Sequence, residues 1–229
     1  MAYISREDFL KQQAERQERA NSPRQSSGVG YLKLANDGDE AVVRFCYTNP
    51  DQFDILTVHD TKVDGKFRRV NCLRESFKSS PDTCPFCAAG EKPKNRFYVK
   101  LIEYTRDEND PQKVNAQPKI WDTSTSYVNV LNNLCTEFGD ISDFVFKIKR
   151  NGMKGDTNTS YSILPTNPAV YTADAYPKNN DAFKDYNILG TAVLDKTYDE
   201  LAEMVHGTGT SNVVPEQTTT PRVPQVAYY

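Results

Sequence analysis

Histidine and cysteine are scarce in this sequence, and their scarcity limits the chemistry that the chain can perform. Among 229 residues there are two histidines and five cysteines. His206 stands isolated beside a polar C-terminal segment, at the end of a predicted helix, where it can act as a cap. The phosphate-binding loop Gly-x-x-x-x-Gly-Lys-Ser/Thr is absent as well. Because no group of residues is suited to catalysis, we expect a protein that is not an enzyme.

The sequence also lacks long apolar stretches. None approaches the roughly 20 apolar residues that a membrane-spanning helix needs. Residues 1–8 lack the basic-then-apolar pattern of a signal peptide. Five cysteines, an odd number, argue against a framework of disulfides. We therefore expect a reduced, soluble protein of the cytoplasm with no membrane partner.

Positive charge is not in excess. Lys and Arg total 28 against 31 Asp and Glu, so the formal net charge is −3. A protein of this charge binds nucleic acid only through a local basic surface, with its acidic residues placed elsewhere. The apolar share of 38% is low for a compact globular protein, and it predicts polar segments that bury little.

The histidine and cysteines between positions 59 and 87 have the spacing of metal ligands. They read His59-x12-Cys72-x11-Cys84-x2-Cys87. Two residues separate Cys84 from Cys87, so both sulfurs can face one ion from a tight turn. His59 and Cys72 complete a tetrahedron, and four protein ligands leave no open position for water or substrate. The spacing predicts one structural Zn²⁺.

Other interpretations of the cysteines stay open at the level of the sequence. Cys-x-x-Cys can be a redox motif, although that motif needs a βαβ context and none surrounds Cys84. A disulfide requires an oxidising compartment. A cysteine can also be a small buried hydrophobe, which is the usual role of a residue such as Cys46 inside an apolar strand.

Alternating patterns and turn signals predict a mainly β (α+β) core over residues 31–165, built from about six short strands. Asp64-Gly65 is a strong hairpin signal. Many short strands favour a small OB-fold-like barrel, here with a zinc-binding insertion at about 56–95 and a few peripheral helices. Segments with strand character lie at 41–47, 52–59, 67–72, 95–104, 119–122, 143–150 and 161–164.

Helical spacing and composition divide the rest of the chain. Residues 1–30 are expected to form a helical arm followed by a linker, and residues 127–138 a helix that ends at Gly139. Residues 166–206 are expected to be an irregular segment that lies over the domain, ending in an acidic amphipathic helix. The Thr- and Pro-rich residues 207–229 are expected to be a disordered tail.

Basic and aromatic residues alternate along several predicted strands, a combination that suits single-stranded nucleic acid. Lys and Arg neutralise phosphates, while each base that stacks on an aromatic ring contributes roughly 1–3 kcal/mol. Aromatic residues in strands are equally often core, and charged residues are often a solvated face. The candidates are Arg44, Tyr47, Arg68, Arg69, Arg96, Tyr98, Lys100, Tyr104, Trp121, Lys147, Lys149 and Tyr161.

The ligand spacing, together with the strand-loop-strand of residues 144–165, resembles the zinc-containing single-stranded DNA-binding (helix-destabilising) proteins of T-even-like phages. The resemblance covers roughly residues 30–165 and is carried mostly by the ligand pattern, whose middle interval is slightly longer here. It implies an OB-fold, a structural zinc beside the binding cleft, and location in the host-cell cytoplasm. It further implies coating of single strands during replication, recombination and repair, self-association along the strand, and contacts with replication and recombination proteins through the arm or tail.

Two features depart from that family. Its basic arm corresponds here to residues 6–19, in which Glu is mixed with Arg and Lys, and its acidic tail corresponds to a segment with Glu216 as the one acid after residue 206. Two other functions fit the ligand pattern: a zinc-ribbon adaptor that binds proteins of phage replication or transcription, and a zinc-dependent nuclease. Whether DNA or RNA is preferred is not set by the sequence, because stacking platforms serve both.

Overall fold

The computed structural model describes residues 28–63, 65–107, 110, 113–156, 158–178 and 181–207. The predicted arm, apart from its last residues, and the predicted tail after residue 207 lie outside the described residues. No helix in the described part of the chain is long and apolar enough to span a membrane.

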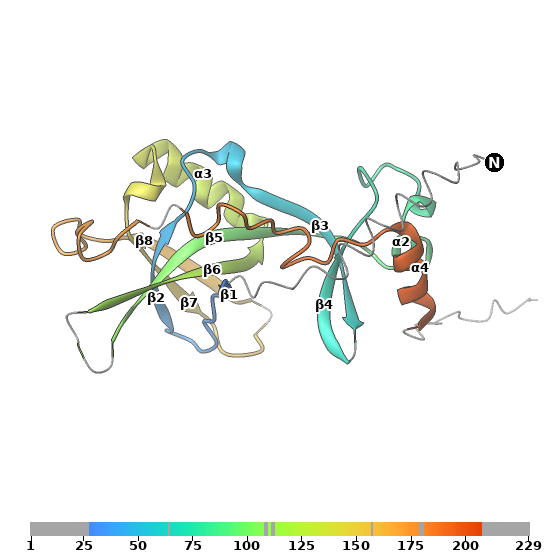
Figure 1. The fold of residues 1–229 in the computed structure, drawn as a ribbon, viewed down its shortest axis with the longest axis horizontal. Helices are drawn as coiled ribbons and strands as arrows, with labels where there is room; N and C mark the ends of the chain where they lie inside the picture. The colour runs from blue at the N-terminus through green and yellow to red at the C-terminus, as the bar shows by residue number, and fades with distance from the viewer. Residues whose placement is uncertain are drawn as a thin grey trace, which may run out of the picture.

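The described residues form a mainly β fold with few helices, as predicted (Figure 1). The sheet order is β1-β6-β5-β2-β7-β8, and β3 pairs with both β5 and β4. Within the described residues β1 and β8 are unpaired ends of this path, so the sheet is open. The strands are β1 (Gly30–Tyr31), β2 (Glu40–Phe45), β3 (Asp54–Val63), β4 (Lys66–Asn71), β5 (Lys94–Arg106), β6 (Val114–Ser124), β7 (Phe146–Asn151) and β8 (Ser160–Pro165).

Strand β5 is the centre of this sheet. One edge pairs with β6 over residues 96–106, and the other is shared by β3, opposite residues 94–98, and β2, opposite residues 101–104. Tyr47 closes the point where β2 and β3 diverge. Its hydroxyl donates to the Tyr98 carbonyl oxygen at 3.0 Å and accepts from the Lys100 N–H at 2.9 Å. Tyr47 therefore holds the sheet together from its interior.

One face of the sheet packs against helix α3 (Ser126–Phe138), which forms where the sequence predicts it. Gly139 ends the helix with φ of +71°, a conformation that suits glycine. Leu131 and Cys135 of α3 are buried against the inward residues of β2, β5, β6 and β7. The predicted inward set of β5, with Phe97, Val99 and Leu101, lies in this core.

The opposite face of the sheet is covered by residues 166–178 and 181–194, which cross it as an irregular segment, and the chain then continues to α4 (Tyr198–Gly207) (Figure 1). Ile188 and Val193 pack on Tyr98, while Tyr176 packs on Tyr104. The alternation of β5 predicts a second face that is basic and aromatic at one end. The structure differs, because the aromatic rings of that face are core residues beneath the crossing segment.

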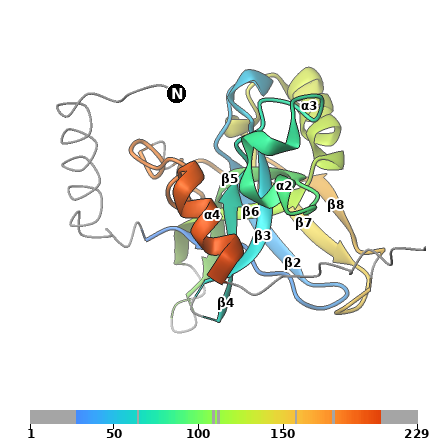
Figure 2. The same ribbon diagram turned by 90° about the vertical axis from the view of Figure 1, so that its right-hand side faces the viewer.

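The hairpin of β3 and β4 extends beyond the main sheet, and short helices pack against it (Figures 1 and 2). Helix α4 lies beside α2 and begins with a capping box: Thr197 N–H donates to the Glu200 carboxylate at 2.8 Å, and Glu200 N–H donates to the Thr197 hydroxyl at 3.5 Å. We call β3, β4, α2, α4 and the loop between β4 and α2 the metal-centre module. The short helices of the chain are η1 (Pro50–Gln52), η2 (Pro81–Thr83), α2 (Pro85–Ala88) and η3 (Ile141–Asp143).

Candidate metal centre and nucleic-acid interface

The four predicted metal ligands lie together in the metal-centre module. His59 is in the interior of β3, opposite Val70 of β4, rather than at the end of a strand as the sequence predicts. Cys72 directly follows β4, Cys84 precedes α2, and Cys87 lies within α2. His59, Cys84 and Cys87 are buried and Cys72 is half-buried. Their ligand atoms all lie within 4.8 Å of one another.

The distances between these atoms fit one zinc ion. His59 Nε2 lies 3.5 Å from Cys84 Sγ and 3.5 Å from Cys87 Sγ, and Cys72 Sγ lies 3.7 Å from Cys87 Sγ. A tetrahedral Zn²⁺ with bonds of about 2.3 Å to sulfur and about 2.0–2.1 Å to nitrogen has N···S edges near 3.6 Å and S···S edges near 3.8 Å. The cluster therefore matches a closed structural site in both donor set and dimensions.

The protonation of the ligands is also consistent with metal binding. Burial, assisted by Arg74 and opposed by Asp60, lowers the pKa of His59 to about 4, so the imidazole is neutral at pH 7. Burial raises the pKa of Cys72 to about 12 and also raises that of Cys87. These thiols keep their protons in the absence of a cation, so a bound metal displaces protons from them.

Arg74 supports the cluster from outside. Its guanidinium lies beside Cys87 and lowers the pKa of that thiol, in opposition to burial. The same group donates to the carbonyl oxygen of Phe77 and, at 2.6 Å, to that of Ser79, so it fixes the loop between β4 and α2. Sequence reasoning treats Arg74 as one of several basic residues near the zinc. Its place immediately after a ligand strand is the one signal that could have marked it.

The metal cluster is part of a small apolar core. The Phe86 ring stacks on the His59 ring with centroids 5.2 Å apart. Val70 and Leu201 are fully buried in the same cluster, and Met204 of α4 packs against it. A bound ion would therefore join β3, the residue that follows β4, and α2, and the apolar core extends this contact to α4.

The twelve predicted nucleic-acid contacts fall into three groups, of which the first is buried. Arg44 is 3% exposed and donates to the Tyr104 hydroxyl, the Ser142 carbonyl and the Tyr176 carbonyl. These bonds tie the crossing segment to β2, so Arg44 supports the fold and has no surface for a phosphate. The buried candidates are Arg44, Tyr47, Tyr98, Tyr104 and Trp121.

The second group is paired with carboxylates. Asp122 binds the guanidinium groups of both Arg96 and Arg69, and Arg96 reaches it with two bonds of 2.7 and 2.8 Å. Arg69 also pairs with Asp60 at 3.1 Å, and Lys94 pairs with Asp60 at 2.6 Å. Lys100 and Lys149 are paired in the same way, with Asp54 at 3.0 Å and Glu40 at 3.5 Å.

The third group is at least partly exposed to solvent. Arg68 is exposed on β4, and Lys147 and Tyr161 are half-buried. Two exposed aromatic rings that sequence reasoning left out of the candidates lie near Arg68: Phe67 is 56% exposed on β4, and Tyr31 is 46% exposed on β1.

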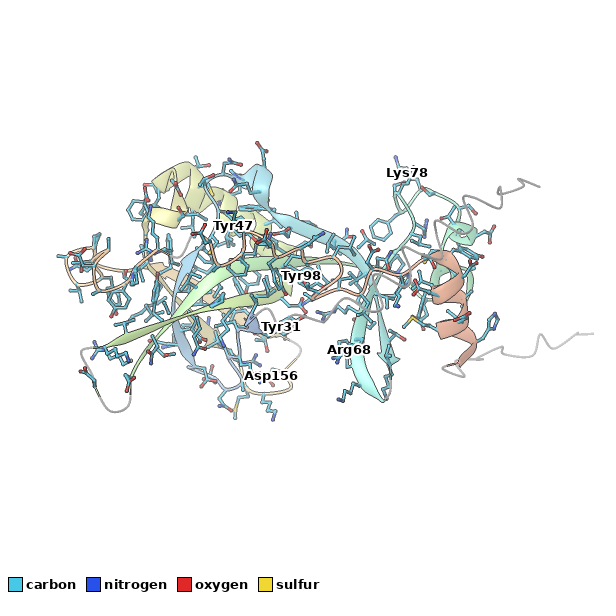
Figure 3. All side chains as sticks on the ribbon, viewed as in Figure 1. Tyr31, Tyr47, Arg68, Lys78, Tyr98 and Asp156 are labelled. Carbon is cyan, nitrogen blue, oxygen red and sulfur yellow. The ribbon has the colours of Figure 1, made fainter. Side chains whose placement is uncertain are left out.

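Tyr31 of β1 lies near the basic residues of β4. Burial and the neighbouring Tyr186 and Tyr98 raise its pKa, while the guanidinium groups of Arg69 and Arg68 oppose the shift. Figure 3 shows Tyr31 and Arg68 on the same side of the molecule. The main sheet, through Tyr31 of β1, and the β3–β4 hairpin, through Arg68 of β4, therefore bring an aromatic and a basic group near one another.

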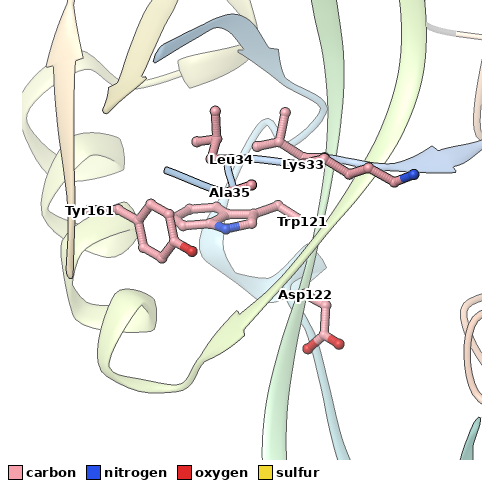
Figure 4. Close-up of a pocket in the computed structure, with 7 residues that line it drawn as sticks. Lys33, Leu34, Ala35, Trp121, Asp122 and Tyr161 are labelled. Atoms are coloured by element: carbon pink, nitrogen blue, oxygen red, sulfur yellow. The ribbon is translucent and has the colours of Figure 1, made fainter. Parts of the chain in front are cut away.

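A cavity of about 280 Å³ lies beside the end of β1. Trp121 and Tyr161 form part of its lining, with ring centroids 5.3 Å apart in an edge-to-face arrangement (Figure 4). Asp122 lines it as well, and its carboxylate, which holds Arg69 and Arg96, points away from Trp121 and Tyr161 (Figure 4). The remaining lining residues are Leu32, Lys33, Leu34 and Ala35.

Comparison with known proteins assigns no family to this chain. No protein-family model matches the sequence, and no curated protein matches it significantly. The chain is thus described by its own features: a mixed β-sheet and a buried His/Cys3 cluster suited to a structural metal such as zinc.

Proposed function

We propose that this protein binds single-stranded DNA with little sequence preference and without catalysis, and that its open sheet is a variant of the OB-fold with one structural Zn²⁺. OB-folds are partly open barrels that bind oligonucleotides on a sheet face and its adjoining loops. The resemblance in ligand spacing points to the same function, in phage replication, recombination and repair. A closed set of four ligands favours a structural over a catalytic metal.

The observation that carries the proposal is the double role of Asp122. Its carboxylate binds Arg69 and Arg96, and the residue also lines the cavity of Trp121 and Tyr161. The guanidinium groups of Arg69 and Arg96 and an aromatic recess therefore adjoin the same residue. A single strand offers both phosphates and unpaired base faces to such a surface, whereas a duplex hides its base faces in the stack.

The β3–β4 hairpin links this surface to the metal centre. His59 and Val70 form one cross-strand pair, and Asp60 and Arg69 form the next. Because successive side chains of a strand point to opposite faces, the metal ligand and Arg69 lie on opposite faces of one hairpin. A metal that fixes the hairpin from one face would thereby orient Arg69 and Phe67 on the other.

A titration of equal-length single-stranded DNA, duplex DNA and single-stranded RNA at several salt concentrations tests the proposal. We expect the single-stranded DNA to bind and quench the Trp121 emission, and the affinity to fall steeply with salt because counterions are released. Stronger binding of RNA would reassign the ligand. Binding of none of the three would favour a protein-binding adaptor instead.

A charge-removal pair makes the test local. Arg68→Ala should weaken binding and reduce the slope of log affinity against log salt by about 0.7, the value for one phosphate contact on a single strand. Arg106→Ala is the matched control, because Arg106 is exposed at the far end of β5, away from the β4 hairpin (Figure 1). Equal effects of the two substitutions would remove the hairpin from the binding surface.

A further inference from the structure

The cavity beside Trp121 exists because β1 stops pairing with β6 too early. β1 and β6 run parallel, and their register ends at the pair Tyr31–Ile120. One more bond follows, from the Leu32 N–H to the Ile120 carbonyl oxygen at 2.9 Å. The chain at residues 32–35 then departs from β6, and the wedge between them is the cavity (Figure 4).

The departure leaves main-chain groups of β6 without partners. The Ile120 carbonyl points to the β1 side, and in a strand the N–H and C=O groups of every second residue point to the same edge. The N–H and C=O of Asp122 therefore also point away from β5, into the wedge. Among the described residues none forms a hydrogen bond with either group. A donor and an acceptor thus stand side by side at the cavity.

The side chains of the cavity complete a recess for a flat ring. Trp121 lines the cavity and is 3% exposed overall. Leu32 and Leu34 provide apolar walls, and the exposed Lys33 stands at the margin. The volume of about 280 Å³ is at the low end of small-molecule sites, which span about 300–1,000 Å³, and so suits one ring system.

We propose that this wedge is a pocket for a single nucleobase, unstacked from the bound strand and held by its edge on the main chain of Asp122. The proposal rests on the function proposed above and adds to it a defined base subsite. Every nucleobase carries a donor and an acceptor next to each other on its Watson–Crick edge, so the pocket accepts all of them. Lys33, an exposed cation in the lining of the pocket, is placed to bind a flanking phosphate.

The test compares an oligothymidylate with an abasic tetrahydrofuran oligomer of the same length, which keeps the phosphates and lacks the bases. Trp121 is the only tryptophan, so its emission reports on this pocket. We expect quenching by the oligothymidylate alone and an affinity at least about 5-fold higher than that of the abasic oligomer, because 5-fold is the lower bound for the stacking of a single base. Equal quenching by both oligomers would overturn the pocket assignment.

A blocking substitution and a crosslink locate the effect. Ala35→Phe places a ring at the cavity from an exposed position, and should abolish the quenching while leaving the affinity for the abasic oligomer unchanged. Ala169→Phe, at an exposed position of the crossing segment, is the matched control.

A crosslinking experiment identifies the residues that contact the base. An oligomer carrying 5-iodouracil should form photoadducts with Trp121 or Tyr161. Adducts on Phe67 alone would refute the pocket but retain strand binding, whereas binding of neither oligomer would refute the proposed function itself.

Discussion

Two cysteines of equal burial provide a direct test of the metal centre. Cys87 is 7% exposed in the metal cluster, and Cys135 is 8% exposed in the core beneath α3, remote from the cluster. Replacement of either by serine buries a hydroxyl in place of a thiol, at a cost of about 1–3 kcal/mol. The two variants therefore differ chiefly in whether a metal ligand is lost.

The size of that difference follows from the ligand set. Structural zinc contributes about 10–16 kcal/mol to small zinc domains at pH 7, so an equal share for one ligand of four is about 2.5–4 kcal/mol. Loss of the ligand should also weaken the packing of the apolar groups around it, among them Phe86 and Leu201, which lowers the free energy of unfolding further. We expect Cys87→Ser to lower the free energy of unfolding by about 3 kcal/mol more than Cys135→Ser when zinc is present.

The assay is urea unfolding of the wild type and both variants, each with zinc and with excess chelator. Chelation should destabilise the wild type and Cys135→Ser alike, and should leave Cys87→Ser almost unchanged, so that the gap between the variants closes. Hydrogen exchange should show the loss first in β4 and α4 and only later in α3. A gap that is the same with zinc and with chelator would refute the argument that Cys87 acts through a metal.

Three further substitutions probe the surroundings of the site. Arg74→Ala should weaken zinc binding about 10- to 100-fold in competition with a chromophoric chelator, because Arg74 orients the loop next to Cys87. Phe67→Ala should lower the affinity for single-stranded DNA by about 1–3 kcal/mol, the loss of one stacking ring, with only a small fall in melting temperature, because the exposed contact of its ring with the Arg69 guanidinium contributes about 0.5–1 kcal/mol. Glu200→Gln should destabilise α4 by about 0.5 kcal/mol in thermal unfolding, because it weakens an exposed pair with Lys196.

The first two of these substitutions have matched control residues, and the third has a pH dependence that can be checked. Lys78 is exposed on the same loop as Arg74 and should be replaceable without effect on zinc, and Phe77 matches Phe67 at 55% exposed. For Glu200, partial burial is outweighed by the bonds from Lys196 and Thr197, and its pKa lies below the usual value. Its contribution is therefore present above the unfolded pKa near 4.5 and is lost as the pH falls through the lower folded value. An effect of Glu200→Gln that persists at lower pH would contradict this assignment.

Local signals in the sequence predicted local structure well. The spacing of His59, Cys72, Cys84 and Cys87 was sufficient to predict a four-ligand cluster, because a tight Cys-x-x-Cys turn needs no distant partner to form. The Asp64-Gly65 signal predicted a hairpin, and β3 and β4 pair on either side of it. These features depend on residues close in sequence, where steric preference decides the outcome.

Strand β6 was predicted too short for a reason that is visible in its register. It runs from Val114 to Ser124, whereas only residues 119–122 were predicted, because Pro118 and the polar residues around it resemble a loop. Pro118 has the same parity as Ile120, whose main chain points away from β5. The missing N–H of Pro118 therefore lies on the outer edge, where it removes no bond to β5, and the strand continues through it.

The basic and aromatic candidates show most clearly where sequence reasoning ends. Alternation placed Tyr98 and Tyr104 on one face of β5, but it could not reveal that residues 166–194 return to cover that face. Charge counting identified Arg69 and Arg96, but not that Asp122, about 50 and 26 positions away in the sequence, already holds both. Both features depend on contacts between distant segments. Exposure is then the better guide to a binding surface, because a large aromatic ring left in water, such as Phe67, gains stability only when a ligand covers it.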